Sequence, residues 1–285
     1  MKRHAILSIG VVSGLMVSTL LVPVRNTLAQ GKVAKDFVAP TVFQAAGPTA
    51  ASILDSINEY RAALGQTNNG NAAGPLEDGR REINWDGGNV NNQTTTISGN
   101  PFAGFQVTRG ALFTTPDGSG FVQAPPVADA AQFPPGGLAG VFNNPTYGTI
   151  FKAFSPSRLF SAIDSNVTEV DFFVPGGGEM KATVTGFGAI FTDVDQPDGG
   201  GNGKKHSPST QIDFLDSDGD VLFSSFVPAS PGDGTFSFLG ILFNDARIAR
   251  VRITAGNSAP GKDDGGKRDV VMMDDFIYGE PQPLH

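Results

Sequence analysis

The chain has 285 residues, a formal net charge of −8 and no cysteine. The lack of cysteine excludes disulfides, thiol catalysis and thiolate zinc sites. The excess of acidic side chains disfavours binding to nucleic acid and to anionic lipid, and it favours divalent cations.

Residues 1–29 are typical of a secretory signal. A basic start precedes an uncharged apolar run from Ala5 to Val24, and the small residues Thr27 and Ala29 fit cleavage after Ala29. An uncleaved membrane anchor is the alternative, because about 20 apolar residues can span a bilayer. Cleavage removes three basic residues and no acidic one, so the mature chain is still more acidic. We therefore expect a secreted or cell-surface protein with no membrane insertion after signal removal.

Residues 30–80 are expected to form a lead-in that contains one amphipathic helix. Residues 30–47 show no clear period, whereas residues 49–64 repeat apolar side chains at intervals of four, three and four before Gly65. The apolar residues of this stripe are Ile53, Ile57, Tyr60 and Leu64. A polar linker then leads to residue 80.

After residue 80 the helical period disappears, and short apolar runs between turn residues predict β-strands. The runs are REINW, GFQVTRGALF, TEVDFFV, KATVTGFGAIF, TQIDFLD, VLFSSFV, TFSFLGILF, IARVRIT and VVMMDDFIY. The 37 glycines and 20 prolines of the chain agree with many short strands joined by turns. The sequence therefore predicts a mainly β protein, an antiparallel jelly-roll-like β-sandwich over residues 81–281 with one N-terminal amphipathic helix before it.

Two kinds of catalysis can be considered from the residue types. A catalytic histidine is not expected, because His206 lies in a glycine-rich loop that would hold a general base poorly. Paired carboxylates could serve a polysaccharide hydrolase, which needs two of them facing each other across a cleft. The candidate carboxylates are Glu82, Asp86, Glu169, Asp171, Asp193 and Asp195. A secreted polysaccharide hydrolase is therefore the second functional hypothesis.

Two acidic segments could bind a cation. In DSDGDV, residues 216–221, Val221 stands where an EF-hand loop needs glycine, so we expect the turn of a β-hairpin. In FTDVDQPDGGGNG, Asp193 and Asp195 lie two apart at a strand end and share one side, and Asp198 follows in a loop. Calcium takes six to eight oxygen ligands, and this segment could supply some of them. The alternative is an acidic strand end that is simply solvated.

The run RDVVMMDDFIYGEP near the end of the chain places two adjacent aspartates in an apolar strand. Successive side chains of a strand point to opposite faces, so either Asp274 or Asp275 is expected to face the core. A buried carboxylate must be protonated, be paired with a cation or lie where the strand leaves the core.

Several segments together resemble a group of uncharacterised exported bacterial proteins. They are GRREINWDGG, SPSRLFSAIDSNVTEVDFFVPG, GFGAIFTDVD, ARIARVRITAGN and DVVMMDDFIYGEP. The resemblance spans residues 49–281 and implies export and a β-rich fold, but no activity. The closing strand is also similar to that of jelly-roll carbohydrate-binding modules, in which an aspartate on the last strand often helps to hold a structural calcium.

The second resemblance implies that the first and last strands lie close together. This arrangement would bring the acidic residues of the first strand near the aspartate pair. One aspartate of the pair would then face solvent or a loop backbone, and the other would join Asp193 and Asp195 around calcium. The predicted calcium ligands are Asp193, Asp195, Asp274, Asp275, Glu82 and Asp86. The alternative is that the inward aspartate forms an ion pair with Arg80 or Arg81 or is held by backbone hydrogen bonds.

These observations predict a non-catalytic protein at the cell surface or outside the cell. Its expected partner is an extracellular glycan or matrix ligand, and its expected cofactor is calcium.

Overall fold

The computed structural model describes residues 39–87, 93–127, 136–196, 210–262 and 268–284. The predicted signal at residues 1–29 and the loop that carries Asp198 and His206 lie outside these ranges. Within them, every pairing between strands is antiparallel. No helix in the described ranges is long and apolar enough to cross a membrane.

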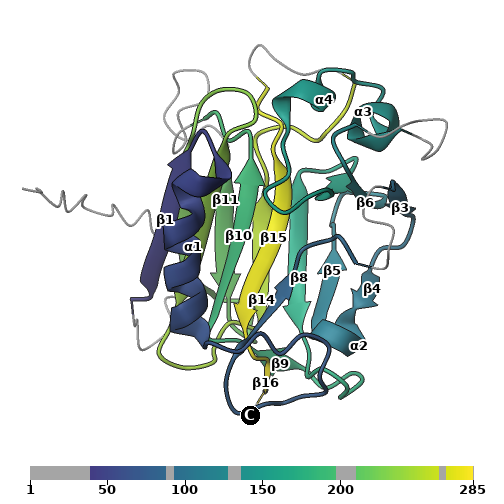
Figure 1. The fold of residues 1–285 in the computed structure, drawn as a ribbon. Helices are drawn as coiled ribbons and strands as arrows, with labels where there is room; N and C mark the ends of the chain where they lie inside the picture. Colours follow the sequence, from purple (N-terminus) through teal and green to yellow (C-terminus); the bar gives the residue numbers. More distant parts are fainter. Residues whose placement is uncertain (1–38, 88–92, 128–135, 197–209, 263–267, 285) are drawn as a thin grey trace, which may run out of the picture. The chain divides into compact units, whose positions relative to one another are not determined.

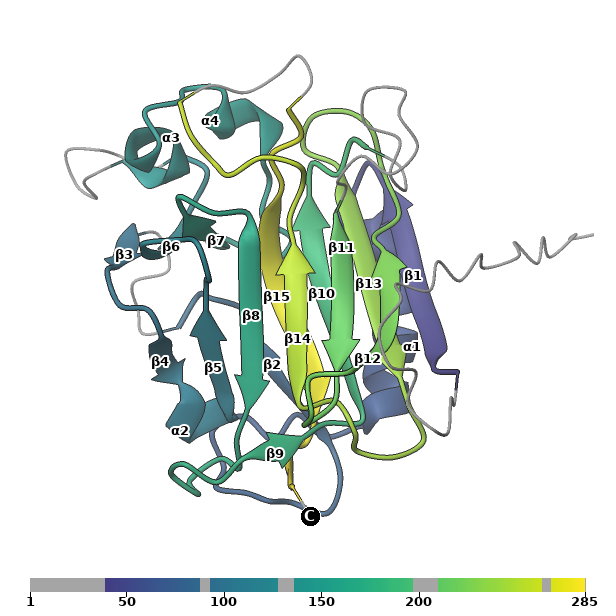
Figure 2. The same ribbon diagram turned by 180° about the vertical axis from the view of Figure 1, so that it is seen from behind.

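The strands form two large sheets, which Figures 1 and 2 show from opposite sides. The eight-stranded sheet runs in the order β1 (Thr41–Gly47), β13 (Phe236–Leu242), β10 (Gly186–Thr192), β15 (Met272–Gly279), β7 (Leu159–Ile163), β6 (Gly120–Ala124) and β3 (Thr95–Ile97), with β2 (Arg80–Ile83) also paired to β15. The six-stranded sheet runs β12 (Val221–Phe226), β11 (Gln211–Leu215), β14 (Arg250–Thr254), β8 (Val167–Phe172), β5 (Ala111–Thr114) and β4 (Phe102–Phe105). The remaining elements are the pair β9 (Ala182–Thr183) and β16 (Gln282–Pro283) and the helices α1 (Ala50–Leu64), α2 (Gln106–Arg109), α3 (Gly137–Val141) and α4 (Tyr147–Ile150).

The two large sheets pack face to face around one apolar core. Phe187 and Phe276 of the eight-stranded sheet belong to the same buried cluster as Val170 and Ile253 of the six-stranded sheet. Aromatic rings fill much of this core, as expected for phenylalanine side chains, which have no polar group to satisfy. The predicted mainly β sandwich is therefore confirmed, whereas the jelly-roll connectivity stays a prediction.

The predicted helix is confirmed as α1, and all four residues of its apolar stripe are buried. It covers the face of the eight-stranded sheet that is turned away from the six-stranded sheet, which we call the outer face (Figure 1). Tyr60 lies over three glycines, Gly186, Gly188 and Gly240, and a Cβ atom at Gly188 would come within 2.8 Å of its ring. Glycine is needed at this position because the helix approaches the sheet so closely.

Two expectations about local structure were wrong. Residues 41–47 are strand β1 rather than a lead-in without regular structure, because pairing with β13 supplies hydrogen bonds that the sequence period does not reveal. The run GFQVTRGALF is interrupted by the helical turn α2, which ends at Gly110 with a φ of 73°. The left-handed conformation of Gly110 lets the chain leave the helical turn and enter the next strand, β5.

The predicted hairpin at DSDGDV is confirmed. Strands β11 and β12 pair directly, and the carboxylate of Asp216 accepts the N–H groups of Asp218 and Asp220 in the turn between them. Aspartate and glycine supply this turn with side-chain acceptors and a positive φ at Gly219, so the segment is explained without a bound cation.

Candidate functional site

The adjacent aspartates of β15 lie at a β-bulge. The register between β15 and β10 shifts by one residue there, so Asp274 and Asp275 together lie opposite Ile190. Met273 and Phe276, on either side of the pair, both belong to the core between the sheets. A bulge breaks the alternation of faces, and both carboxylates therefore point to the outer face. The prediction that one of them faces the core was wrong because the strand is not regular at this point.

Residues 151–158 cross the outer face between α4 and β7, and we call this segment the strap. Its first part is fixed to β10, because the N–H of Lys152 donates to Thr192 Oγ1 over 3.2 Å. Just before the strap, the carbonyl of Ile150 accepts the N–H of Gly234 over 2.7 Å. The strap therefore lies across β10 before it reaches β15.

Backbone amides of the strap hold two carboxylates. The N–H of Phe154 donates to Asp274 Oδ2 over 2.6 Å. The N–H groups of Ser157 and Arg158 both donate to Asp86 Oδ1, each over 2.8 Å. Asp86 follows β2, which pairs with β15, so the predicted proximity of the first-strand acids and the aspartate pair is confirmed.

The hydroxyl of Ser155 lies among three carboxylates. Its Oγ is 2.6 Å from Asp275 Oδ1, 3.0 Å from Asp274 Oδ1 and 3.2 Å from Asp86 Oδ2. A serine hydroxyl donates one hydrogen bond and accepts two. The hydroxyl can donate to only one of these carboxylates, so its other two contacts would need hydrogens from the acids. We call Asp86, Asp274, Asp275 and Ser155 the bulge cluster.

Two arginines compensate the charge at the edge of this cluster. Arg61 of α1 lies 2.7 Å from Glu82 Oε2 and 3.7 Å from Asp275 Oδ2, and Arg80 donates to the other oxygen of Glu82 over 2.7 Å. The predicted pairing of Arg80 or Arg81 with an aspartate of the pair was therefore wrong, whereas the backbone hydrogen bonding that was also expected is confirmed by the N–H of Phe154. The helix supplies the cation instead.

Burial raises the pKa of both aspartates of the pair. Asp274 is only 1% exposed, and desolvation raises its pKa well above that of an ordinary aspartate. The charge of Asp275 and the hydrogen bond between the two carboxyl groups raise it further, whereas the bonds from Phe154 and Ser155 lower it. For Asp275, burial also raises the pKa, but Ser155, Asp274 and Arg61 lower it. Burial therefore favours the protonated form of Asp274 more strongly than that of Asp275.

Asp193 and Asp195 lie beyond the end of β10, in a different place. The N–H of Asp195 donates to Asp269 Oδ1 over 3.3 Å, and its carboxylate accepts the N–H of Gly232 over 2.8 Å. The chain from Asp269 to Asp275 covers roughly 20 Å at the usual rise of a strand. The six predicted calcium ligands therefore do not form one cluster.

The bulge cluster does not fit a calcium ion as it stands. Calcium needs six to eight oxygens around an open point, and here the Ser155 hydroxyl occupies the point on which the carboxylates converge. Among the described residues, no group of three or more histidine, aspartate or glutamate side chains could hold a metal ion. Calcium binding by this chain stays a prediction.

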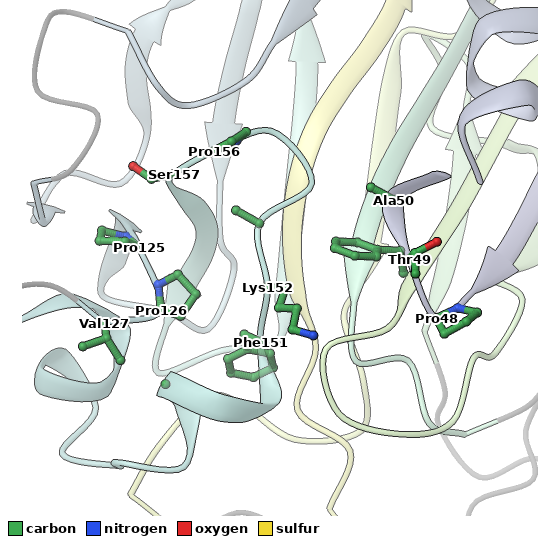
Figure 3. A pocket seen from close by; sticks show the side chains of 13 residues that line it. Pro48, Thr49, Ala50, Pro125, Pro126, Val127, Phe151, Lys152, Pro156 and Ser157 are labelled. Carbon is green, nitrogen blue, oxygen red and sulfur yellow. The ribbon is translucent and has the colours of Figure 1, made fainter. Parts of the chain in front are cut away.

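A groove of about 670 Å³ lies against the strap (Figure 3). Pro125, Pro126 and Val127 line one side, Pro48, Thr49 and Ala50 line the other, and Phe151 and Lys152 lie between them. Lys152 is the one charged side chain among the described lining residues, and it has no ion pair in the described part of the chain. Pro156 and Ser157 also line the groove, so the strap separates it from the bulge cluster.

Sequence reasoning did not identify the residues that complete this site. Ser155 and the rest of the strap have no periodic pattern, and Arg61 lies on the polar side of α1, where an arginine needs no explanation. The only feature of the sequence that pointed to Ser155 was the segment that begins SPSRLF in the first resemblance.

Comparison with family models, with curated proteins and with solved structures gives no match to this chain.

Proposed function

We propose that this chain is an exported, non-catalytic protein that binds an extracellular glycan in the groove beside the strap. The observation that supports this proposal is the groove itself. Small-ligand sites are commonly concave, about 300–1,000 Å³ in volume and mostly apolar, with a few polar groups that orient the ligand. The groove has this size and lining, and export rests on the signal-like residues 1–29.

The lining favours a sugar that carries an acidic group. Sugar rings have apolar C–H faces that can pack against prolines and Val127, while Lys152 can bind a hydroxyl or a carboxylate. The two aromatic residues of the lining, Phe151 and Phe236, are almost fully buried, so ring stacking is not expected to dominate.

Binding is favoured over hydrolysis because the candidate carboxylates are engaged elsewhere. Among the described residues that line the groove, no side chain carries a carboxylate. On the outer side of the six-stranded sheet, Glu169 pairs with Arg252 at 2.6 Å and Asp171 with Arg250 at 2.9 Å. A glycosidase needs two carboxylates that face one open cleft.

The test is an oligosaccharide array probed with the mature chain, followed by measurement of reducing-sugar release from any polymer that binds. We expect retention of one or more acidic glycans without release of sugar. Val127→Glu should weaken binding at least tenfold, because it places a charge in the apolar wall. Val107→Glu is the matched control, since Val107 is 62% exposed on α2, Val127 is 58% exposed, and only Val127 lines the groove.

Three results would count against the proposal. They are no retained glycan, equal loss of binding in the two valine variants, and sugar release that depends on the candidate carboxylates. The last result would support the polysaccharide hydrolase.

A further inference from the structure

We propose that the free edge of β1 pairs with β1 of a second copy of this chain, so that the protein forms a symmetric dimer with one continuous antiparallel sheet. The two-fold symmetry places the same residues on both sides of the contact. The proposed function does not use this surface, so the dimer does not depend on it.

Strand β1 is the terminal strand at one side of the eight-stranded sheet. Within the described part of the chain it pairs only with β13, in an unbroken register from Thr41 to Gly47. Its other edge therefore presents the N–H and C=O groups of every second residue, to which no described strand pairs. Figures 1 and 2 both show this edge on the side of the sandwich opposite β3 and β4.

The other described edges carry features that oppose pairing with another chain. Strands β3, β4, β9 and β16 are only two to four residues long. Strand β12 contains a bulge where its register with β11 shifts, and β2 has the highly charged sequence RREI. Short length, bulges and charged side chains are common ways in which edge strands are protected from other chains.

Strand β1 has none of these protective features. It is seven residues long, its register with β13 is regular, and its sequence TVFQAAG is uncharged. A single unprotected edge in each chain can be satisfied by one second copy. The association therefore closes as a dimer and does not continue into a fibre.

Two prolines set the register of the proposed pairing. Pro40 and Pro48 flank β1, and each lies four positions from Gln44. Proline has no N–H group to donate to a ladder, so it limits the stretch that can pair. The longest pairing of two copies is therefore centred on Gln44, which lies opposite Gln44 of the second copy. In this register, residues with outward backbone groups in one copy face residues with outward backbone groups in the other.

The distribution of charge favours this contact between two copies. The chain has a formal net charge of −8, so contacts between charged faces of two copies tend to bring like charges together. Pairing of β1 with itself places no charged side chain of one strand opposite a charge of the other. Gln44 is exposed, and its amide can both donate to and accept from the same amide of the second copy.

A single strand pair makes a small interface, so we expect a weak dimer. Seven residues span about 24 Å at the usual rise of a strand, and interfaces at the low end of the size range bind weakly. Pro48, which follows β1, also lines the groove. The antiparallel dimer therefore has one groove beyond each end of the strand pair, and a long polymer can bind both. This last consequence alone rests on the proposed function.

The experiment measures the mass of the mature chain, which contains every described residue, by sedimentation velocity over a wide range of concentration. We expect a monomer–dimer equilibrium that becomes tighter when salt is added, because salt screens the repulsion between two acidic chains. Hydrogen exchange should become slower at the amides of β1 in the dimer and stay unchanged in β3. A chain that stays monomeric at every concentration, or that forms open-ended polymers, would overturn the proposal.

Charged variants test whether the edge of β1 makes the contact. Gln44→Lys combined with Ala46→Lys places like charges next to each other across the symmetry axis and should weaken dimerisation about tenfold. Gln44→Glu combined with Ala46→Glu should also weaken it, and an equal mixture of the two variants should restore it. Thr96→Lys combined with Ser98→Lys, at the edge formed by β3, is the matched control and should leave dimerisation unchanged. All four positions are exposed, so the variants should fold.

Other outcomes would assign the edge or the dimer differently. If the lysine variant of β1 dimerises like the original chain, or if mixing does not restore the dimer, β1 does not pair with itself and the proposal is wrong. If the mature chain is monomeric and dimerises only after removal of residues 30–38, its own N-terminal segment covers the edge, which also overturns the proposal. A dimer that forms as expected while no glycan binds contradicts the proposed function alone.

Discussion

The buried charged side chains of this protein differ in how many of their polar atoms have a hydrogen-bond or ion-pair partner. Arg81 is fully buried, and its guanidinium donates to both oxygens of Glu280 over 2.7 Å. Its remaining nitrogen donates to backbone carbonyls at Gly70, Ala72 and Thr108. This pair ties the linker after α1 to the end of β15, and its loss should affect stability more than any ion pair on the surface.

Glu280→Gln should lower the free energy of unfolding by about 3 kcal/mol, because it leaves a buried guanidinium without its counter-charge. Urea unfolding measures the change. Asp245→Asn is the control, since Asp245 is exposed and its pair with Arg247 should contribute less than about 0.5 kcal/mol. Similar losses in the two variants would contradict this account of the buried pair.

Asp269 is the opposite case, because it is buried with one oxygen unsatisfied. It is 2% exposed, its Oδ2 has no hydrogen-bond partner, and burial raises its pKa to about 6. A carboxyl whose pKa is raised by folding binds its proton more tightly in the folded state. Its contribution to stability is therefore complete below about pH 4 and is lost as the pH rises to about 6.

Asp269→Asn should remove this loss. Above pH 6 the variant is expected to be more stable than the original chain by roughly 2–3 kcal/mol, and below about pH 4 the difference should vanish. Denaturant unfolding across this pH range measures it. Asp233→Asn, at an exposed position, is the control. If the stability of Asp269→Asn and of the original chain changed with pH in the same way, the raised pKa of Asp269 would be contradicted.

At the scale of elements, α1 is the part of the fold that the sequence predicts best. Its stripe is a local pattern, and the same four residues are the ones that the helix buries. Bulges and irregular segments give no such signal. The register shift at Asp274 depends on β10, more than 80 residues earlier in the chain, and the strap has no period that could predict where Ser155 lies. Long-range pairing, rather than local propensity, decides these features.

Ile57→Ala tests the role of α1 as the cover of the outer face. Ile57 is fully buried, and its truncation should cost about 2–5 kcal/mol through lost burial and a cavity. Leu54→Ala is the matched control, because Leu54 lies on the same helix and is 40% exposed. Thermal unfolding of both variants compares them, and a loss of similar size at Leu54 would contradict the predicted difference.

At the scale of the whole described fold, two segments of the first resemblance, GRREINWDGG and DVVMMDDFIYGEP, pair with each other. RREI of β2 and FIYG of β15 lie side by side. The buried pair of Arg81 and Glu280 lies at one end of this pairing, and the bulge cluster lies beyond the other end. The pairing could be expected from the second resemblance, but the partners of the carboxylates could not, because they come from α1 and the strap.

A thermal melt with and without EDTA separates the two ways in which the acids could be held. If Arg61 and the strap hold the aspartate pair, the midpoint should be the same in both conditions. A ligand that binds only the folded state raises the midpoint, so a lower midpoint in EDTA would support the calcium prediction. The melt also reports on any site at Asp193 and Asp195.

The most direct test of the account is the NMR titration of the side-chain carboxyl carbons of Asp274 and Asp275. Burial of the pair predicts that at least one carboxyl group titrates well above the pKa of an ordinary aspartate, about 3.9. Because Asp86 also contacts Ser155, Asp86→Asn should change the apparent pKa of the pair. Titration of both carboxyl groups near pH 4, as exposed aspartates show, would contradict this account of the pair.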